Sequence, residues 1–189
     1  MGSSITYESL AGKLLIAAPH TDPDSYFART VIYLAKYNHN EGAVGVVVNH
    51  PFPSSSSELI IKDCLKNDEV FSLEHTEAYV GGPIESERGF ILHSHQTCSY
   101  YPSSIYSSSN VGLLKNISSE KSHPHKMFVF GYCGWRKEQL EAEIKRGYWF
   151  VLPLDNKIIF ETTNAEKWDR ALECLNISPI KYSNRSGNC

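Results

Sequence analysis

The stretch that decides the fold class is residues 126–149, which read KMFVFGYCGWRKEQLEAEIKRGYW. Its first part, Lys126–Tyr132, is apolar on both faces of an extended chain, which predicts a buried strand in the middle of a sheet. Two glycines follow within Gly131–Gly134 and predict a turn. The next residues, Lys137–Arg146, predict a helix because their apolar side chains recur at helical spacing. A strand, a turn and a helix in this order indicate mixed α and β structure.

The predicted helix has two different faces. Leu140 and Ile144 fall on one side, where we expect them to pack against the sheet. Glu138, Glu141 and Lys145 fall on the other side, where we expect them to face water. Glu141 precedes Lys145 by four residues, which is the favourable order for an ion pair across one helical turn.

Other segments of the chain predict further strands. Runs of apolar and β-branched residues place them at Leu14–Ala18, Thr30–Ala35, Ala43–Asn49, Ala78–Val80, Gly89–His93, Tyr148–Leu152 and Lys157–Phe160. Turn-forming residues from Asn38 to Gly42 separate the second run from the third, so these two are expected to form an antiparallel hairpin. The last two runs flank Asp155 and Asn156, which predicts a second hairpin there.

Loops and short helices are expected between these strands. Ser54–Ser57 and Ser94–Asn110 are rich in serine and predict surface loops. Leu59–Cys64 predicts a short helix after the first of them. Thr163 and Glu166 form a capping box, in which each side chain can satisfy the backbone donor of the other residue, and this predicts the start of the last helix.

Length and charge limit the classes of protein. The chain has 189 residues with 41% apolar and 21% charged residues, which is typical of one globular domain. We expect this domain at residues 10–178, with flexible termini at 1–9 and 179–189. The net charge of −3 disfavours direct nucleic-acid binding, because duplex-binding proteins concentrate positive charge. The densest basic cluster, Lys121–Lys126, is a weak patch.

The cysteines and the apolar runs bear on compartment. Five widely spaced cysteines without a CxxC pair are typical of reduced thiols rather than of a disulfide framework or a structural zinc site. No secretory signal is recognisable, and no apolar run reaches the ~20 residues of a membrane helix. We therefore expect a cytoplasmic protein that does not enter a membrane.

Several ordered motifs resemble one known family. They are Gly131-Tyr132-Cys133-Gly134-Trp135, Gln139-Leu140-Glu141 with Glu143-Ile144, Trp149, Gly81-Gly82-Pro83, Arg88-Gly89-Phe90 with Leu92-His93, and an opening set of Leu14-Leu15-Ile16-Ala17, Pro19, Phe27, Arg29, Val31, Gly42, Gly45 and Asn49. On these motifs the chain resembles the YqgE/AlgH family of bacterial proteins over about residues 10 to 178. The resemblance implies an α+β fold with a mixed, mostly antiparallel, curved or barrel-like sheet flanked by a few helices.

The resemblance implies no biochemical activity. Some members carry the label of transcriptional regulator through a genetic effect, and the motifs have no catalytic assignment. The sequence also departs from the family pattern. Arg136, Lys137 and Glu138 follow Trp135 where small residues and a second glycine are usual, and Asn176 replaces a usual glycine. A glycine at that turn would allow close approach of a ligand, and this chain lacks it.

The two glycine-containing turns are the main candidates for a binding site. A glycine-rich turn before a helix exposes backbone N–H groups that can hold an anion. The candidate ligand-binding residues are Gly81, Gly82, Pro83, Arg88, His93, Tyr132, Trp135, Gln139 and Glu143. A structural interpretation is slightly favoured: the glycines permit tight turns, and Trp135 and Trp149 are core aromatics. Neither turn matches a nucleotide-binding motif, so no cofactor is predicted.

Histidine and cysteine pairs offer an alternative chemistry. His93 with His95 and His123 with His125 have metal-ligand spacing, and Cys98 or Cys133 could complete a set. Pro124 interrupts the second pair and no acidic partner stands at a diagnostic spacing, so no metal site is predicted. Cys133 could be an activated thiol near a helix N-terminus, but a small buried residue is favoured.

The functional hypothesis is a non-enzymatic regulatory domain that binds an unknown small molecule or protein partner, with any effect on transcription indirect. The alternative is a hydrolase that uses His93 with Cys133 or a bound metal. No catalytic residue is assigned.

Overall fold

A computed structural model describes residues 10–64, 77–94, 103–107 and 126–178. Its elements follow one another as β1 (Leu14–Ala17), β2 (Val31–Asn38), β3 (Gly42–Val47), α1 (Ser54–Cys64), β4 (Ala78–Val80), β5 (Ile84–Ser94), β6 (Ser103–Ser107), β7 (Lys126–Trp135), α3 (Gln139–Lys145), β8 (Trp149–Leu152), the π-helix η2 (Lys157–Glu161) and α4 (Lys167–Cys174). None of the helices in these described ranges is both long and apolar enough to cross a lipid bilayer.

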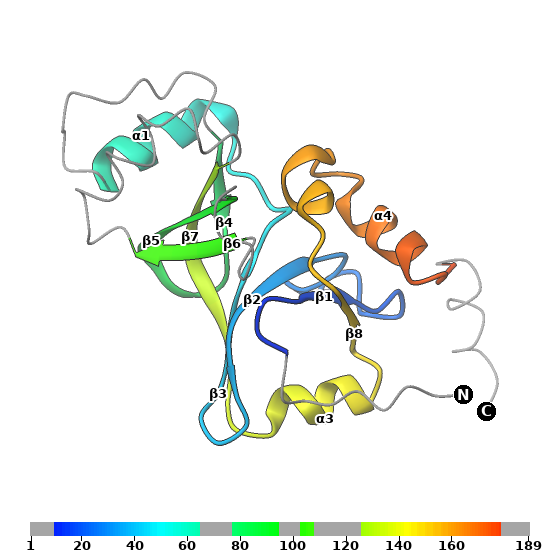
Figure 1. Ribbon diagram of the computed structural model, residues 1–189. Coiled ribbons are helices and arrows are strands. Elements are labelled where there is room, and N and C mark those ends of the chain that lie inside the picture. The colour runs from blue at the N-terminus through cyan, green and yellow to red at the C-terminus, as the bar shows by residue number, and fades with distance from the viewer. Residues whose placement is uncertain (1–9, 65–76, 95–102, 108–125, 179–189) are drawn as a thin grey trace.

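The strands form one mixed sheet. Their order is β6-β5-β7-β3-β2-β1-β8, with β4 paired to β7 in parallel and the other neighbours antiparallel. The sheet bends where β7 meets β3, so that β4, β5 and β6 lie in one half and β1, β2 and β8 in the other (Figure 1). The predicted α+β class with a mostly antiparallel curved sheet is confirmed.

β7 belongs to both halves of the sheet. Its first residues pair with β4 and β5, and its last three, Cys133–Trp135, pair with β3. The predicted turn at Gly131–Gly134 is therefore wrong, because the chain continues as a strand through it. Gly131 has a φ of 73°, and a Cβ atom there would lie 2.4 Å from the carbonyl oxygen of Gly82. Glycine thus lets the strand bend closely past its neighbour without reversing direction.

The predicted hairpin of β2 and β3 is confirmed, since they pair antiparallel from Ile32 opposite Val47 to Asn38 opposite Gly42. Two predicted loops are wrong in part. The serines from Ser54 onward form the first turn of α1, where the Ser57 N–H donates to the Pro53 carbonyl. β6 forms within the second predicted loop, because β5 offers it an edge to pair with.

The second predicted hairpin is also wrong. Residues from Lys157 form the π-helix η2, and β8 pairs with β1 instead. Ile158 and Ile159 are both buried, whereas successive residues of a strand would point to opposite faces. The Thr162 N–H donates to the Lys157 carbonyl, five residues back, which is the π-helical bond.

β1 is covered on both faces, because its four residues are all buried. Leu14 and Ile16 belong to one core cluster, together with Trp168 and Leu172 of α4. The alternate residues of β1 belong to a second cluster with Leu140 of α3. The two helices therefore cover opposite faces of this half of the sheet, as Figure 1 shows.

The first half of β7 is likewise apolar on both faces. Phe128 and Phe130 pack in a cluster with Ile61 of α1, whereas Met127 and Val129 join the cluster that includes α4. The prediction that this segment lies centrally in the sheet is confirmed, since β4 and β5 flank it.

The predicted exposure of Glu141 is wrong. This side chain of α3 is buried, and its Oε1 accepts a hydrogen bond of 2.7 Å from the Tyr37 hydroxyl. The same oxygen lies 3.1 Å from Nδ1 of His39. The end of the β2–β3 hairpin therefore packs against α3 through polar side chains, a long-range contact that helical spacing does not reveal.

Candidate functional site

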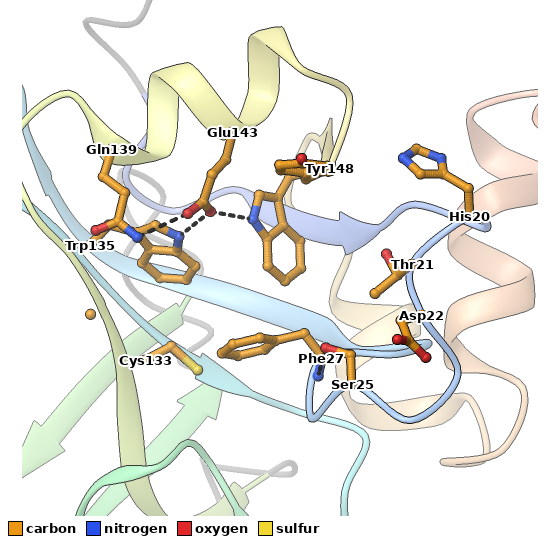
Figure 2. A pocket seen from close by; sticks show the side chains of 12 residues that line it. His20, Thr21, Asp22, Ser25, Phe27, Cys133, Trp135, Gln139, Glu143 and Tyr148 are labelled. Carbon is orange, nitrogen blue, oxygen red and sulfur yellow. Dashed lines mark hydrogen bonds between the residues drawn. The ribbon is translucent and has the colours of Figure 1, made fainter.

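Three of the predicted site residues, Trp135, Gln139 and Glu143, line one cavity of about 350 Å³. The cavity lies between the end of β7, one side of α3, the start of β8 and the segment after β1 (Figure 2). Its lining residues are His20, Thr21, Asp22, Ser25, Phe27, Cys133, Gly134, Trp135, Gln139, Glu143, Tyr148 and Trp149. Sites for small molecules in proteins have volumes of about 300–1,000 Å³.

The helix α3 supplies two polar side chains to this cavity. Gln139 and Glu143 are four residues apart, so they lie on the same side of the helix. Gln139 is held at both ends of its amide. Its Oε1 accepts the Arg136 N–H at 3.1 Å, and its Nε2 donates to Glu143 Oε1 at 2.9 Å. The amide therefore links the end of β7 to the carboxylate in the cavity.

The Glu143 carboxylate is fixed by three donors. Its Oε2 accepts the indole N–H groups of Trp135 and Trp149, both at 2.8 Å, and its Oε1 accepts the Gln139 amide. The two indoles come from different strands, β7 and β8, and both N–H groups reach the same carboxylate oxygen of α3. A carboxylate strengthens such bonds, because hydrogen bonds to a charged acceptor are about twice as strong as neutral ones. One carboxylate therefore ties α3 to β7 and β8.

Aromatic rings form the inner walls of the cavity. The rings of Trp135 and Trp149 meet at 82° with centroids 6.0 Å apart, and those of Phe27 and Trp149 meet at 77° and 5.7 Å. These are edge-to-face arrangements, which aromatic pairs favour. Tyr148 lies beside His20 and is half exposed. The cavity thus has a rigid apolar interior and a more polar segment, residues 20–25, along one side.

Cys133 contributes a buried thiol. Its Sγ donates to the Gly81 carbonyl at 3.4 Å, and burial raises the pKa of the thiol to about 12. The sulfur is therefore protonated at neutral pH and is a poor nucleophile. The interpretation of Cys133 as a small buried residue agrees with this geometry.

The Gly81-Gly82-Pro83 turn lies behind this wall rather than in the lining. A Cβ atom at Gly82 would come within 2.1 Å of the Tyr132 backbone, so the glycine permits β7 to pass closely. The Gly81 N–H donates to the Phe130 carbonyl. The turn therefore supports the strand that carries Cys133, and its Gly81 N–H is already bonded to that strand.

Arg88, which is exposed, and Tyr132, which is partly buried, form a separate group. Both contact Glu85, with Arg88 Nη1 and the Tyr132 hydroxyl each 2.9 Å from a carboxylate oxygen. Arg88 also lies 5.4 Å from the centre of the Phe90 ring. Tyr132 neighbours Cys133 in β7, and successive side chains of a strand point to opposite faces. The structure therefore does not bring Arg88 and Tyr132 together with Gln139 and Glu143.

His93 lies far from the cavity. It is buried in β5 and stands opposite Lys126 at the start of β7, whereas Cys133 is near the end of that strand. Seven residues of extended chain separate the two β7 positions, or roughly 23 Å at the usual rise per residue. His93 and Cys133 are therefore not within reach of one another for nucleophile and base chemistry.

The other metal-ligand candidates are only partly described. His95, Cys98, His123 and His125 lie outside the described residues. Within the described ranges, no three His, Cys, Asp or Glu side chains gather as metal ligands do.

Nine of the twelve lining residues were missing from the predicted ligand-binding set: His20, Thr21, Asp22, Ser25, Phe27, Cys133, Gly134, Tyr148 and Trp149. Two signals were available. The polar run after the buried strand β1 has the composition of a functional loop, since binding residues are often carried on loops. Trp149 and Phe27 also stand in the motifs that suggested the family, but aromatic residues near a strand are typical of a core.

Comparison with known proteins places the chain in one family. A profile described as AlgH-like matches residues 14–180. The "UPF0301 protein" of Rickettsia felis is 31% identical over 192 residues, covering 100% of both chains. A UPF0301 protein of Rickettsia canadensis is 31% identical and covers 96% of this chain and 97% of its own.

Two solved structures are similar. The solution structure of the AlgH protein from Pseudomonas aeruginosa has a TM-score of 0.69 and 31% identity, and the match covers 100% of this chain and 98% of that one. A crystal structure of a Corynebacterium diphtheriae protein also has a TM-score of 0.69, over 92% and 90% of the two chains, but its identity of 19% shows the fold alone. The resemblance that the motifs suggested is confirmed, and this chain belongs to the AlgH-like family.

Proposed function

We propose that this chain is a non-enzymatic regulatory domain whose cavity between α3 and residues 20–27 binds a small molecule. The observation that carries this proposal is the Glu143 carboxylate, which two indole N–H groups and one amide hold in the wall of a mostly aromatic cavity. Apolar walls with a few fixed polar groups are the usual form of a small-molecule site. A group that is already fixed loses little further freedom when it binds a ligand.

The side chains of the cavity favour binding over catalysis. Ser25 and Asp22 lie near His20, but each serves the backbone: Ser25 Oγ accepts the Phe27 N–H at 3.3 Å, and Asp22 Oδ1 accepts the Asp24 N–H at 2.9 Å. A catalytic serine would need a base within hydrogen-bond reach. The thiol of Cys133 is held protonated by burial, with its pKa raised to about 12. The described residues that line the cavity therefore offer no activated serine or cysteine.

A regulatory role would reach transcription indirectly. The net charge of −3 gives little attraction for a nucleic-acid backbone, so direct DNA binding is not part of the proposal. A ligand changes a protein's contacts with a partner only when it binds one conformation better than another. The unidentified binding partner is thus either the small molecule itself or a protein whose contacts with this domain depend on that molecule. Free thiols at Cys133 and Cys174 suit a cytoplasmic location.

The test is a thermal-stability screen of the full chain with one- and two-ring compounds that are positive, negative or neutral. A compound that binds only the native state raises the melting temperature by mass action. Two variants of one residue provide the control. Ser25→Ala and Ser25→Leu both lose the hydrogen bond from the Phe27 N–H, but only leucine fills part of the cavity.

We expect at least one compound to stabilise the wild type and Ser25→Ala but not Ser25→Leu. If no compound stabilises the wild type, or if Ser25→Leu is stabilised equally, the cavity is not a binding site and the proposal is wrong.

A further inference from the structure

The cavity carries an excess of negative charge. Asp22 and Glu143 are its carboxylates, and its twelve lining residues include no lysine or arginine. Arg29, on the loop that follows Phe27, is occupied elsewhere: it pairs with Asp169 at 2.9 Å and lies 4.5 Å from the centre of the Trp168 ring. Clefts with low-dielectric walls and charges of one sign focus the electric field. The field in this cavity therefore favours a cation.

The Glu143 carboxylate retains capacity for one more donor. A carboxylate has about four lone-pair positions. Three are used by Trp135, Trp149 and Gln139, none of which carries a formal charge. The three donors fix the position of the negative charge without neutralising it. A ligand N–H or a methylated ammonium group would therefore meet an oriented carboxylate that has no cationic partner among its described contacts.

The aromatic walls have the same preference. The faces of aromatic rings carry partial negative charge and attract cations, with tryptophan the strongest. Phe27, Trp149 and Trp135 all line the cavity, and their successive rings meet at 77° and 82°. Such contacts are strongest when the cation is shielded from water. A carboxylate anion in the same space would meet both the ring faces and Glu143 unfavourably.

Asp22 places a second carboxylate on the opposite side of the cavity from α3 (Figure 2). It is exposed, and its Oδ1 accepts the Asp24 N–H, which fixes the side chain in a turn. Asparagine retains an oxygen for this bond, so the charge can be removed while the turn is kept. Asp24, two residues away, is also exposed and does not line the cavity, which makes it a matched control.

We propose that the cavity selects small organic cations. The ammonium group of such a ligand would lie in the cavity, among the indole rings and the carboxylates of Asp22 and Glu143. This inference rests on the proposed function, because it names the chemical class of the molecule that the cavity binds. It excludes anionic metabolites such as phosphates and carboxylates as the preferred ligands.

The test compares three probes of one shape by calorimetric titration of the full chain: benzylammonium, benzyl alcohol and benzoate. We expect benzylammonium to bind at least about ten-fold more tightly than benzyl alcohol, with benzoate weakest. Asp22→Asn should weaken benzylammonium by about five-fold and leave benzyl alcohol unchanged, because only the charge is lost. Asp24→Asn should leave both affinities unchanged.

Three outcomes overturn the inference. Equal binding of benzylammonium and benzyl alcohol would leave a small-molecule site without a charge preference, so the proposed function would survive. Tighter binding of benzoate than of benzylammonium would also refute the preference for cations and leave the proposed function standing. Absence of benzylammonium binding to the wild type would also refute the inference, while the screen with the two Ser25 variants would still decide the proposed function separately.

Discussion

Glu143 and Lys167 are both charged side chains held within the fold, and they are held in different ways. Lys167 is 2% exposed, its ammonium donates to the Val48 carbonyl at 2.7 Å, and it lies 5.2 Å from the centre of the Tyr79 ring. Glu143 is only partly buried, and its partners are the side chains that form a cavity wall.

The difference separates a structural charge from a candidate functional one. Lys167 begins α4 and joins it to the backbone that follows β3, so its contacts serve the scaffold. Glu143 fixes Trp135 and Trp149 and still borders open space. A buried charge that bonds to the backbone of a neighbouring segment stabilises the scaffold, whereas a fixed charge beside a cavity is a candidate for recognition.

The two regions also contain comparable tryptophans, which give the largest expected effects. Trp135 of the cavity is 7% exposed and Trp168 of α4 is 4% exposed. Replacing either with alanine should lower the free energy of unfolding by about 3–5 kcal/mol, measured by urea denaturation. Trp135→Ala should also abolish benzylammonium binding, whereas Trp168→Ala should retain it in the folded protein. Loss of benzylammonium binding in both variants would contradict the claim that Trp135 belongs to the binding site and Trp168 only to the scaffold.

For Lys167 we predict a contribution to the free energy of unfolding that rises with pH. Burial lowers its pKa from 10.5 to about 8, so the unfolded chain binds more protons than the native state between these values. The native state should therefore gain about 1 kcal/mol relative to the unfolded chain between about pH 7 and pH 9 through this residue. The measurement is the difference in that gain between wild type and Lys167→Met. Lys145→Met, on the exposed side of α3, is the control; an equal change in both variants would refute the assignment.

For Cys133, in the wall of the cavity, we predict the opposite dependence on pH: the free energy of unfolding should fall as pH rises. Burial raises the pKa of its thiol from 9.0 to about 12, so the unfolded chain loses the proton first as pH rises. The stabilising contribution is complete below about pH 9 and is lost as pH rises toward 12, with about 1 kcal/mol lost between about pH 8 and pH 10. Cys133→Ala should show a correspondingly smaller loss in urea denaturation. An unchanged slope would mean that the thiol is accessible to water in the native state.

Much of the fold follows from local sequence patterns. The double-faced apolar run Lys126–Phe130 and the turn residues before β3 identify a central strand and a hairpin, and both are present. Tertiary partners decide the segments that were predicted wrongly. The two buried isoleucines of η2 pack toward α4, and β6 forms because β5 provides an edge.

The site was less predictable, because residues far apart in sequence form it. Gln139 and Glu143 were among the expected residues, and both line the cavity. Arg88 was placed with them because it could add a positive charge to an anion site. The pairing of β5 with β7 instead directs Arg88 toward Glu85. Sequence spacing does not reveal on which face of the bent strand β7 the side chain of Arg88 will lie.

The smallest expected effect is a contrast between Gln139→Ala and Arg88→Ala. Both side chains are exposed, so each change should lower the free energy of unfolding by less than about 1 kcal/mol. Gln139→Ala should weaken benzylammonium binding, because Glu143 loses one of its three donors. Arg88→Ala should not change it. Equal weakening by the two variants, measured by calorimetry, would place Arg88 in the site and contradict the separation described here.

The most direct test of a binding role for the cavity uses the indole N–H resonances of the three tryptophans in ¹⁵N-labelled full-length protein. Trp135 and Trp149 donate to Glu143 in the cavity, and Trp168 donates to the Ala17 carbonyl outside its lining. During titration with benzylammonium, we predict that the Trp135 and Trp149 resonances shift together and saturate while the Trp168 resonance stays in place. If the first two do not move, or if all three move alike, the cavity is not where the cation binds.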